Sequence, residues 1–305
     1  MKKTILFALA IMALCNQPLK AQYYYYNDRY YDSPVVFEMG VSGGIMNALT
    51  DLGGKAGVGK GFIKDLRWAT ARPSYGAYFA ATYNNAIAVR LEGTVGTIVG
   101  YDSILKKVAS TSTGRYERNL SFKSRISEVQ LGFEIHPLFI RNMDDHDPPR
   151  LSPYLILGVG YFSFDPQANL NGTWYQLKPL HTEGEGFKEY PDKKNYQTSQ
   201  LNLLGGLGLR FELTSIFNVR LELVHRKLFT DYLDDVSTTY IDPNLFYNYL
   251  PANMAAIAQQ LANRKSELNP NDMTNAGDQR GDPSNKDSYF TIQLKVGMTL
   301  GRRQR

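Results

Sequence analysis

The stretch Leu201–Leu213, LNLLGGLGLRFEL, decides the fold because every second residue along it is apolar, with Gly205 as the exception. The alternate positions include two glycines and the charged pair Arg210 and Glu212. The run Asn218–Val224 repeats the alternation after a short break. A period of two over this length is typical of β-strands, so the two runs are expected to form a hairpin.

The charged face of these runs indicates which kind of sheet they build. In a soluble sandwich the inward face is apolar, and glycines mixed with charges would not form a core. In a closed barrel in lipid the apolar face points outward and the interior is polar. The sequence therefore predicts an all-β fold, a closed antiparallel transmembrane β-barrel.

The N-terminus predicts export. Met1–Lys3 is basic, Ile5–Leu14 is an apolar run, and Leu19–Ala21 offers a cleavage site, so residues 1–21 are interpreted as a signal peptide. The apolar run is too short to cross a bilayer, which takes roughly twenty helical residues. Cys15 is the one cysteine of the chain. Cleavage after the signal would leave no cysteine, which excludes disulfides and cysteine metal sites.

The composition agrees with a barrel. A hydrophobic content of 43% and a mean hydropathy of −0.34 resemble those of a soluble protein, because alternation averages to neutral. The 21 tyrosines suit the aromatic girdles at the edges of a barrel's apolar belt. The net charge is +5, and the basic residues do not cluster with aromatics, so no nucleic-acid partner is expected.

Eight strands are predicted, an even number as such barrels require. They cover residues 35–46, 74–83, 87–101, 128–135, 153–164, 201–213, 219–223 and 290–300. The connections alternate between short and long, which predicts short periplasmic turns, long outer loops and both termini in the periplasm. The expected domains are a tyrosine-rich leader (22–34), the barrel (35–301) with its last outer loop (230–287), and a basic tail (302–305).

An eight-stranded barrel is just wide enough to be filled by its own side chains. Charges held at membrane depth are costly unless they are paired, so the inward charges are expected to form an ion-pair network that plugs the lumen. The alternative is a proton or ion pathway. The expected network consists of Glu38, Arg90, Glu92, Glu128, Glu134, Arg210, Glu212, Arg220, Glu222 and Lys295.

One stretch resembles a phosphate-binding loop. Gly54–Lys60 fits G-x-x-x-x-G-K, but Gly61 follows where the motif needs Ser or Thr to hold magnesium. The strand before it alternates, whereas such loops follow a buried parallel strand. A flexible outer loop is therefore the better interpretation.

The four histidines show no metal-ligand spacing with one another. His225 with Asp231, Asp234 and Asp235 could form a catalytic rim site, but no nucleophile or oxyanion hole accompanies them. The three aspartates alone could take calcium through their carboxylate oxygens. A solvated loop is the favoured interpretation of the aspartates. No catalytic residue, cofactor or metal is predicted, and the protein is not expected to be an enzyme.

The last outer loop is predicted to contain a helix over residues 254–268. Asn253 is an expected N-cap after Pro251, and Met254, Ile257, Ala258 and Leu261 recur at helical spacing. This helix is expected either to fold over the barrel mouth or to dock a partner.

Three segments resemble the PorG-like outer-membrane barrels: SPYLILGVGYF (152–162), QLNLLGGLGLRFEL (200–213) and FTDYLDDVSTTY (229–240). Asn47 and Asp51 after the first strand are similar too. The resemblance implies an accessory component of the type IX protein secretion and gliding machinery, which contacts periplasmic ring proteins. It brings no catalytic residues. The alternative is a free-standing narrow pore or a surface-binding barrel.

The predicted topology places the leader, the 136–150 connection and the tail on the periplasmic side. Tyrosine and arginine often serve as binding anchors. The alternative is that the leader is a disordered tether and the tail is a solvated end. The expected docking residues are Tyr23, Tyr24, Tyr25, Tyr26, Arg29, Arg141, Asp144, Asp145, Asp147 and Arg150.

Overall fold

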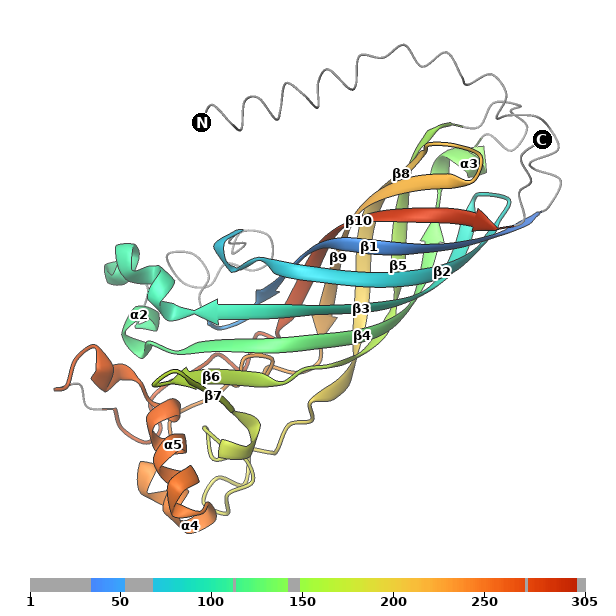
Figure 1. The fold of residues 1–305 in the computed structure, drawn as a ribbon. Helices are drawn as coiled ribbons and strands as arrows, with labels where there is room; N and C mark the ends of the chain where they lie inside the picture. Colours follow the sequence, from blue (N-terminus) through green and yellow to red (C-terminus); the bar gives the residue numbers. More distant parts are fainter. Residues whose placement is uncertain (1–33, 53–67, 112–113, 142–148, 272–273, 301–305) are drawn as a thin grey trace.

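The computed structural model describes residues 34–52, 68–111, 114–141, 149–271 and 274–300. Long strands form a barrel, with the short connections at one end and the long connections at the other (Figure 1). In the described residues no helix has the length and apolarity needed to cross a membrane.

Eight strands make the barrel, and each pairs antiparallel with its neighbour along the chain. Pairing of the last strand with the first closes the ring, which confirms the predicted closed eight-stranded barrel. The strands are β1 (Val35–Leu49), β2 (Arg72–Tyr83), β3 (Ile87–Tyr101), β4 (Ser121–Ile135), β5 (Leu151–Ser163), β8 (Ser199–Glu212), β9 (Phe217–Leu228) and β10 (Ser288–Leu300).

The register around the ring is staggered. Following the paired residues from Phe37 through β2, β3, β4, β5, β8, β9 and β10 returns to β1 at Asn47, ten residues further on. This stagger tilts the strands against the barrel axis and sets the barrel's width. The interior of such a barrel has room for side chains and little else.

The two faces of the strands have the expected character. On β9, for example, Arg220 is fully buried whereas its neighbour Leu221 is 51% exposed. Large apolar side chains are exposed on the outward face of every barrel strand, and they form an apolar belt. Val99 continues this face in register but is buried, near the outer end of β3.

The short connections lie at the end where the described chain begins and ends. Asn84 and Asn85 have positive φ angles of 47° and 55°, as a tight turn between two strands requires. The Asn84 amide donates to the carbonyl of Pro34. The connection after β4, for which the sequence predicted no element, begins with a short helix, α3 (Pro137–Arg141).

The long connections contain further elements, and parts of them fold together into what we call the outer cap (residues 50–52, 164–198, 229–271 and 274–287). The long loop between β5 and β8 holds a hairpin that the sequence did not predict, and this hairpin extends the barrel sheet because β6 pairs with β4. The elements of the connections are 3-10 helices η3 (Trp68–Thr70), η4 (Asp102–Thr111), η5 (Lys178–Leu180), η6 (Pro243–Leu245) and η7 (Lys265–Glu267), helices α2 (Arg115–Arg118), α4 (Phe246–Tyr249) and α5 (Ala252–Ala262), and strands β6 (Pro166–Leu170) and β7 (Thr173–Gln176).

Helix α5 corresponds to the predicted 254–268 helix but ends earlier, at Ala262. Its N-cap is Pro251 and not Asn253. The apolar face of α5 is buried in the outer cap, so the helix belongs to a folded core above the barrel. The buried residues of this core are Ala168, Leu177, Leu180, Phe187, Ile241, Phe246, Ala255, Ala258, Leu261 and Ala262.

Candidate functional site: the charged lumen and the outer cap

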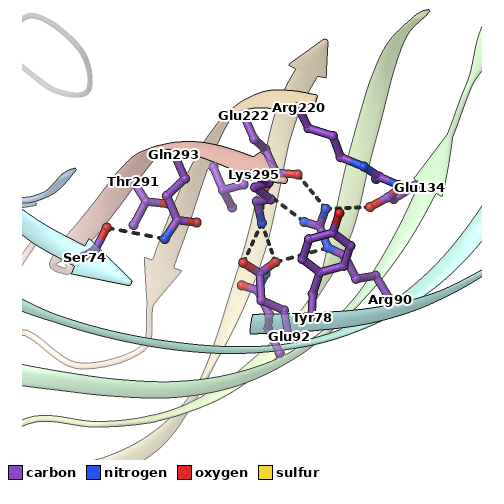
Figure 2. A network of polar contacts seen from close by, with 12 residues as sticks. Ser74, Tyr78, Arg90, Glu92, Glu134, Arg220, Glu222, Thr291, Gln293 and Lys295 are labelled. Atoms are coloured by element: carbon purple, nitrogen blue, oxygen red, sulfur yellow. Dashed lines mark hydrogen bonds and ion pairs between the residues drawn. The ribbon is translucent and has the colours of Figure 1, made fainter. Parts of the chain in front are cut away.

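Arg90 on β3 occupies the centre of the lumen and contacts three glutamates (Figure 2). Its Nη1 lies 2.6 Å from Glu134 Oε1 and 2.7 Å from Glu222 Oε2. Its Nε lies 3.1 Å from Glu92 Oε2. Glu222 also forms an ion pair with the ammonium group of Lys295 at 2.8 Å. The five side chains are buried, so each charge is balanced by protein groups and not by water.

Lys295 and Arg220 extend the network to the other side of the barrel (Figure 2). The Lys295 ammonium lies 2.5 and 2.6 Å from the two carboxylate oxygens of Glu92. The Arg220 guanidinium donates to Glu38 at 2.7 Å and to Glu134 at 2.9 Å. These contacts connect β1, β3, β4, β9 and β10. Removal of one partner would leave a buried charge uncompensated, which is strongly destabilising.

Toward the outer end the network continues through Arg226 on β9. Its Nε lies 2.8 Å from Glu128, while its Nη groups donate to Gln130 at 2.9 Å and to Thr291 at 2.8 Å. The Asn202 amide donates to the same glutamate at 2.7 Å. Arg226 was not among the residues expected from the sequence. It supplies the cation that Glu128 needs.

Toward the periplasmic end the contacts become longer. Arg210 Nη2 lies 3.5 Å from Glu38 and 3.3 Å from Glu212, whose side chain is partly exposed. His136, directly after β4, lies 3.3 Å from Glu134. The ion pairs of the network are therefore longer and weaker where the lumen meets the periplasm.

The structure places every residue of the expected lumen network on the inward face, and each has at least one ion pair. These residues are Glu38, Arg90, Glu92, Glu128, Glu134, Arg210, Glu212, Arg220, Glu222 and Lys295.

Two tyrosine rings fill space between these charges. The hydroxyl of Tyr78 donates to Glu38 and that of Tyr154 donates to Glu222. Inward glycines make room for them. A Cβ at Gly40 would lie 2.5 Å from Tyr78 Cε1, and one at Gly208 would lie 2.5 Å from the Tyr154 hydroxyl oxygen. The inward glycines of the sequence are therefore packing positions.

Above the network the mouth of the barrel is apolar. Inward residues at the outer ends of the strands pack against residues of the outer cap and form a continuous core. Its buried residues are Met46, Leu52, Ile98, Leu120, Phe122, Ile126, Phe162, Phe164, Tyr196, Leu228, Leu233, Val236 and Tyr289. Charged and apolar side chains thus follow one another along the lumen.

Buried acids organise the outer cap. Glu183 accepts from Arg280 Nη1 at 2.9 Å, and the same nitrogen donates to the carbonyl of Asp235 at 2.6 Å. The Asp235 carboxylate accepts from the hydroxyls of Thr182 at 2.5 Å and Tyr196 at 2.7 Å. These contacts join the connection between β5 and β8 to the one between β9 and β10.

A second group ties the cap to the connection between β3 and β4. Asp102 and Arg118 form a bidentate pair at 2.8 and 2.9 Å, a strong and directional arrangement. Arg118 also donates to the carbonyls of Asp51 at 2.8 Å and Arg280 at 2.6 Å. The Asp51 carboxylate in turn accepts from the amide of Asp282 at 2.5 Å.

Further carboxylates accept from backbone amides. Asp234 accepts from the amide of Leu52 at 3.0 Å, and Asp287 accepts from the amide of Leu233 at 2.9 Å. Asp231 accepts from a serine hydroxyl at 2.7 Å. Asp234 and Asp287 each fix a backbone segment of the cap, and Asp231 fixes a side chain.

The acids of the cap outnumber its cations, and their pKa values respond. Burial, the largest cause, raises the pKa of Asp51 to about 6, of Asp231 to about 7 and of Glu185 to about 8. Burial and then neighbouring carboxylates raise the pKa values of Asp234 and Asp287 well above the ordinary value for aspartate. The cap therefore holds several carboxyl groups that protonate near neutral pH.

The expected solvated loop is wrong for Asp231, Asp234 and Asp235, because all three are buried. His225 lies on the outward face of β9, opposite Phe290 in register, and does not join them. In the described part of the chain no group of three or more His, Cys, Asp or Glu side chains is arranged to hold a metal. The Gly54–Lys60 stretch lies outside the described residues.

The expected periplasmic docking residues fall largely outside the described residues: Tyr23, Tyr24, Tyr25, Tyr26, Arg29, Asp144, Asp145 and Asp147. Arg141 ends α3, and Arg150 is exposed before β5. Phe139 of α3 packs on His136 with ring centroids 6.3 Å apart. Its neighbour Ile140 is exposed at this end of the barrel.

A closed antiparallel ring satisfies every backbone group of its strands, which allows it to cross lipid. Its exposed apolar belt, its charged interior and its alternation of short and long connections are the properties of bacterial outer-membrane barrels. The protein is therefore a transmembrane β-barrel of the outer membrane.

No protein-family model matches the chain, and no curated protein matches it. Similar solved structures are the outer membrane protein OprG from Pseudomonas aeruginosa (10% identity, 88% of this chain and 96% of that chain, TM-score 0.36) and Neisserial surface protein A (6%, 87% and 97%, 0.36). Another is Ail, the attachment invasion locus protein of Yersinia pestis, in complex with the heparin analogue sucrose octasulfate (10%, 87% and 97%, 0.35).

Proposed function

We propose that this barrel is a structural, partner-binding component of the outer membrane. The observation that carries the proposal is the filled lumen. Arg90, Arg220 and Lys295 occupy its centre with their glutamate partners, and the mouth above them is an apolar core. Such an interior supports a rigid anchor and argues against an ion pathway through the lumen.

We propose further that the partners belong to a type IX protein secretion system. The resemblance of three segments to PorG-like barrels supports this role. The most specific of them, residues 229–240, contains Asp231, Asp234 and Asp235, which organise the outer cap. In this proposal the segment holds the cap in shape, and the partners, periplasmic ring proteins, bind at the opposite end of the barrel.

In this proposal the contacts are made at the periplasmic end, where the topology expected from the sequence places the tyrosine-rich leader, the 136–150 connection and the basic tail. In the described part of the connection, the exposed Ile140 sits on a short helix held by the buried Phe139. Burial of this exposed apolar side chain against a partner would contribute to binding.

Affinity purification from detergent-solubilised outer membranes tests the proposal. Periplasmic ring proteins are expected to co-purify with the wild-type barrel. Deletion of residues 23–31, or Ile140→Ser combined with a glycine-serine replacement of residues 142–148, is expected to release them. Heat-modifiable gel migration would show that the barrel stays closed. Tyr247→Ala, on the exposed surface of the cap, is the matched control and should retain them.

The same purification separates the alternatives. Loss of the partners with Tyr247→Ala but not with the periplasmic changes would assign binding to the cap, a folded surface on the opposite side. Recordings in planar bilayers provide the second test. Reproducible single-channel conductance of the wild-type protein would contradict a filled lumen and favour a pore.

A further inference from the structure

The outward positions of the eight barrel strands carry charge at one end only. Apart from His225, every outward position is uncharged except Lys123 and Arg125 on β4 and Lys227 on β9. All three are cationic, and all three lie at the ends of their strands nearest the outer cap. No aspartate or glutamate occupies an outward position in these strands, which the structure describes in full.

The cations begin where the apolar belt ends. On β4 the outward residues change from Val129 through Ser127 to Arg125 and Lys123. On β9 the change runs from the exposed Leu221 and Leu223 to Lys227. The cations therefore stand at the level where hydrocarbon gives way to lipid headgroups.

Hydroxyl groups lie between the two cationic positions. Ser127 on β4 pairs with Ser163 on β5, which pairs with Ser199 on β8. On the far side of β9, Lys227 pairs with Ser288 on β10. These outward serines and the three cations form one polar arc around part of the outer rim of the belt.

An aromatic side chain holds one end of this arc. The Lys123 ammonium lies 3.7 Å from the ring centre of Trp174 on β7, a cation–π contact, and the ring is about half exposed. Tyr161, opposite Val129 in register, is the last large side chain of the belt on β5. Tryptophan and tyrosine concentrate at membrane–water interfaces.

Arg125 and Lys227 make no ion pair with any residue in the described part of the chain, and both are exposed. Lys123 and Arg125 are two residues apart on one face of a strand, roughly 7 Å. One phosphate group can reach both. Cationic side chains are attracted to an anionic lipid surface. A lipid phosphate that contacts two of them is bound more strongly than one that contacts a single cation.

We propose that Lys123, Arg125 and Lys227, with the serines between them, bind the phosphate groups of anionic lipid headgroups in the outer leaflet. A lipid is the occupant, and not a soluble phosphate, because the arc is continuous with the lipid-facing belt. The site would fix the depth and rotation of the barrel in the membrane by binding specific lipids around one side.

Lipid capture from a defined mixture tests this proposal. The wild-type barrel is reconstituted in vesicles of equal parts phosphatidylglycerol and phosphatidylcholine, extracted in mild detergent and examined by native mass spectrometry. Retained lipid is expected to be enriched roughly tenfold in phosphatidylglycerol, since each cation near an anionic surface favours it several-fold. The combined change Lys123→Gln, Arg125→Gln and Lys227→Gln is expected to abolish the enrichment.

A charge-matched variant and a conservative variant complete the test. Lys106→Gln with Lys188→Gln and Lys194→Gln removes the same charge from exposed positions outside the barrel strands and should leave the enrichment intact. A variant that has Lys123→Gln and Lys227→Gln but carries Arg125→Lys in place of Arg125→Gln should recover part of the phosphatidylglycerol enrichment. Heat-modifiable migration identifies any variant that fails to fold, and Arg125→Gln alone then takes its place.

Equal retention of both lipids by the wild-type protein would overturn the proposal, as would enrichment that survives the triple change. Loss of enrichment in the charge-matched variant would assign the effect to net charge. Inorganic phosphate distinguishes the two sources of the ligand. If it stabilises the barrel in neutral detergent and competes with phosphatidylglycerol, the site recognises phosphate alone and not a lipid.

Discussion

The ammonium group of Lys295 on β10 lies 2.5 and 2.6 Å from the two carboxylate oxygens of Glu92 on β3. Two strands, β1 and β2, separate β10 from β3 around the ring. The pair therefore crosses the lumen and connects parts of the barrel that share no backbone hydrogen bonds. Both side chains are fully buried.

This pair predicts strong coupling in a double-mutant cycle. Lys295→Met and Glu92→Gln are each expected to lower the free energy of unfolding by about 3–5 kcal/mol, because each deprives a buried charge of one of its partners. The double variant should lose clearly less than the sum of the two. Urea unfolding in lipid vesicles provides the measurement. Additive losses would show that the two side chains do not interact.

Neighbouring residues on β9 predict how the two faces differ. Arg220→Ala should lower the free energy of unfolding by about 3–5 kcal/mol, since Glu38 and Glu134 lose their shared cation. Leu221→Arg should cost about 2–4 kcal/mol, because it places a charge in the lipid. Equilibrium unfolding of both variants tests the assignment. If Arg220→Ala is neutral while Leu221→Ala is severe, the inward and outward faces are reversed.

Two glycines on the two faces predict opposite responses to a methyl group. In Gly208→Ala the new Cβ would overlap the ring of Tyr154, so the barrel should be destabilised by about 1–3 kcal/mol. At Gly93, on the outward face of β3, no atom lies within 4 Å of the added Cβ. Gly93→Ala should therefore leave the unfolding midpoint unchanged. Similar losses for the two variants would contradict the packing role of the inward glycine.

The two-residue period of apolar side chains in the sequence predicts most of the barrel. It separates Arg220 from Leu221 without ambiguity, because a one-residue slip would place a charge in lipid. It also leads to Arg226, which continues the inward face after Val224. The run His225-Arg226-Lys227 hides that position, since consecutive basic residues resemble the end of a strand. Their outward members belong instead to the headgroup level, where a strand continues beyond the belt.

The outer cap could not be predicted in the same way. Burial of Asp234 depends on the amide of Leu52, and Glu183 pairs with Arg280 from another connection. Such contacts join segments far apart in the chain and follow no period. A loop rich in aspartate therefore resembles a solvated loop until its partners are known. The periplasmic docking residues remain a prediction.

The carboxyl groups of the cap predict a dependence on pH. Burial raises the pKa of Asp51 to about 6 and of Asp231 to about 7, and it raises the pKa values of Asp234 and Asp287 well above the ordinary value. The folded cap thus holds protons that the unfolded cap has released. The contribution of these groups to stability is fully present below about pH 4, the ordinary pKa of aspartate, and it is lost as the pH rises through their raised pKa values, about 6 for Asp51 and about 7 for Asp231.

Hydrogen exchange, corrected for the intrinsic effect of pH, measures this dependence. The amides of Leu52 and Leu233, which donate to Asp234 and Asp287, should be better protected at pH 5 than at pH 8. Strand amides in the belt should not change. Asp234→Asn, which cannot ionise, should weaken the dependence. Better protection at pH 8 would reverse the sign and exclude protonation of these groups as its cause.

The cap also bears on how the barrel is assembled. Its bonds join Asp51, just after β1, to Asp282, just before β10, and the Asp287 carboxylate lies at the start of β10. These are the two strands that meet at the seam of the cylinder. The cap cannot be completed until the last strand has arrived beside the first. Folding of the cap therefore stabilises the closed pairing of β1 with β10. A chain truncated before β10 would have an unpaired strand edge beneath an incompletely folded, acid-rich cap.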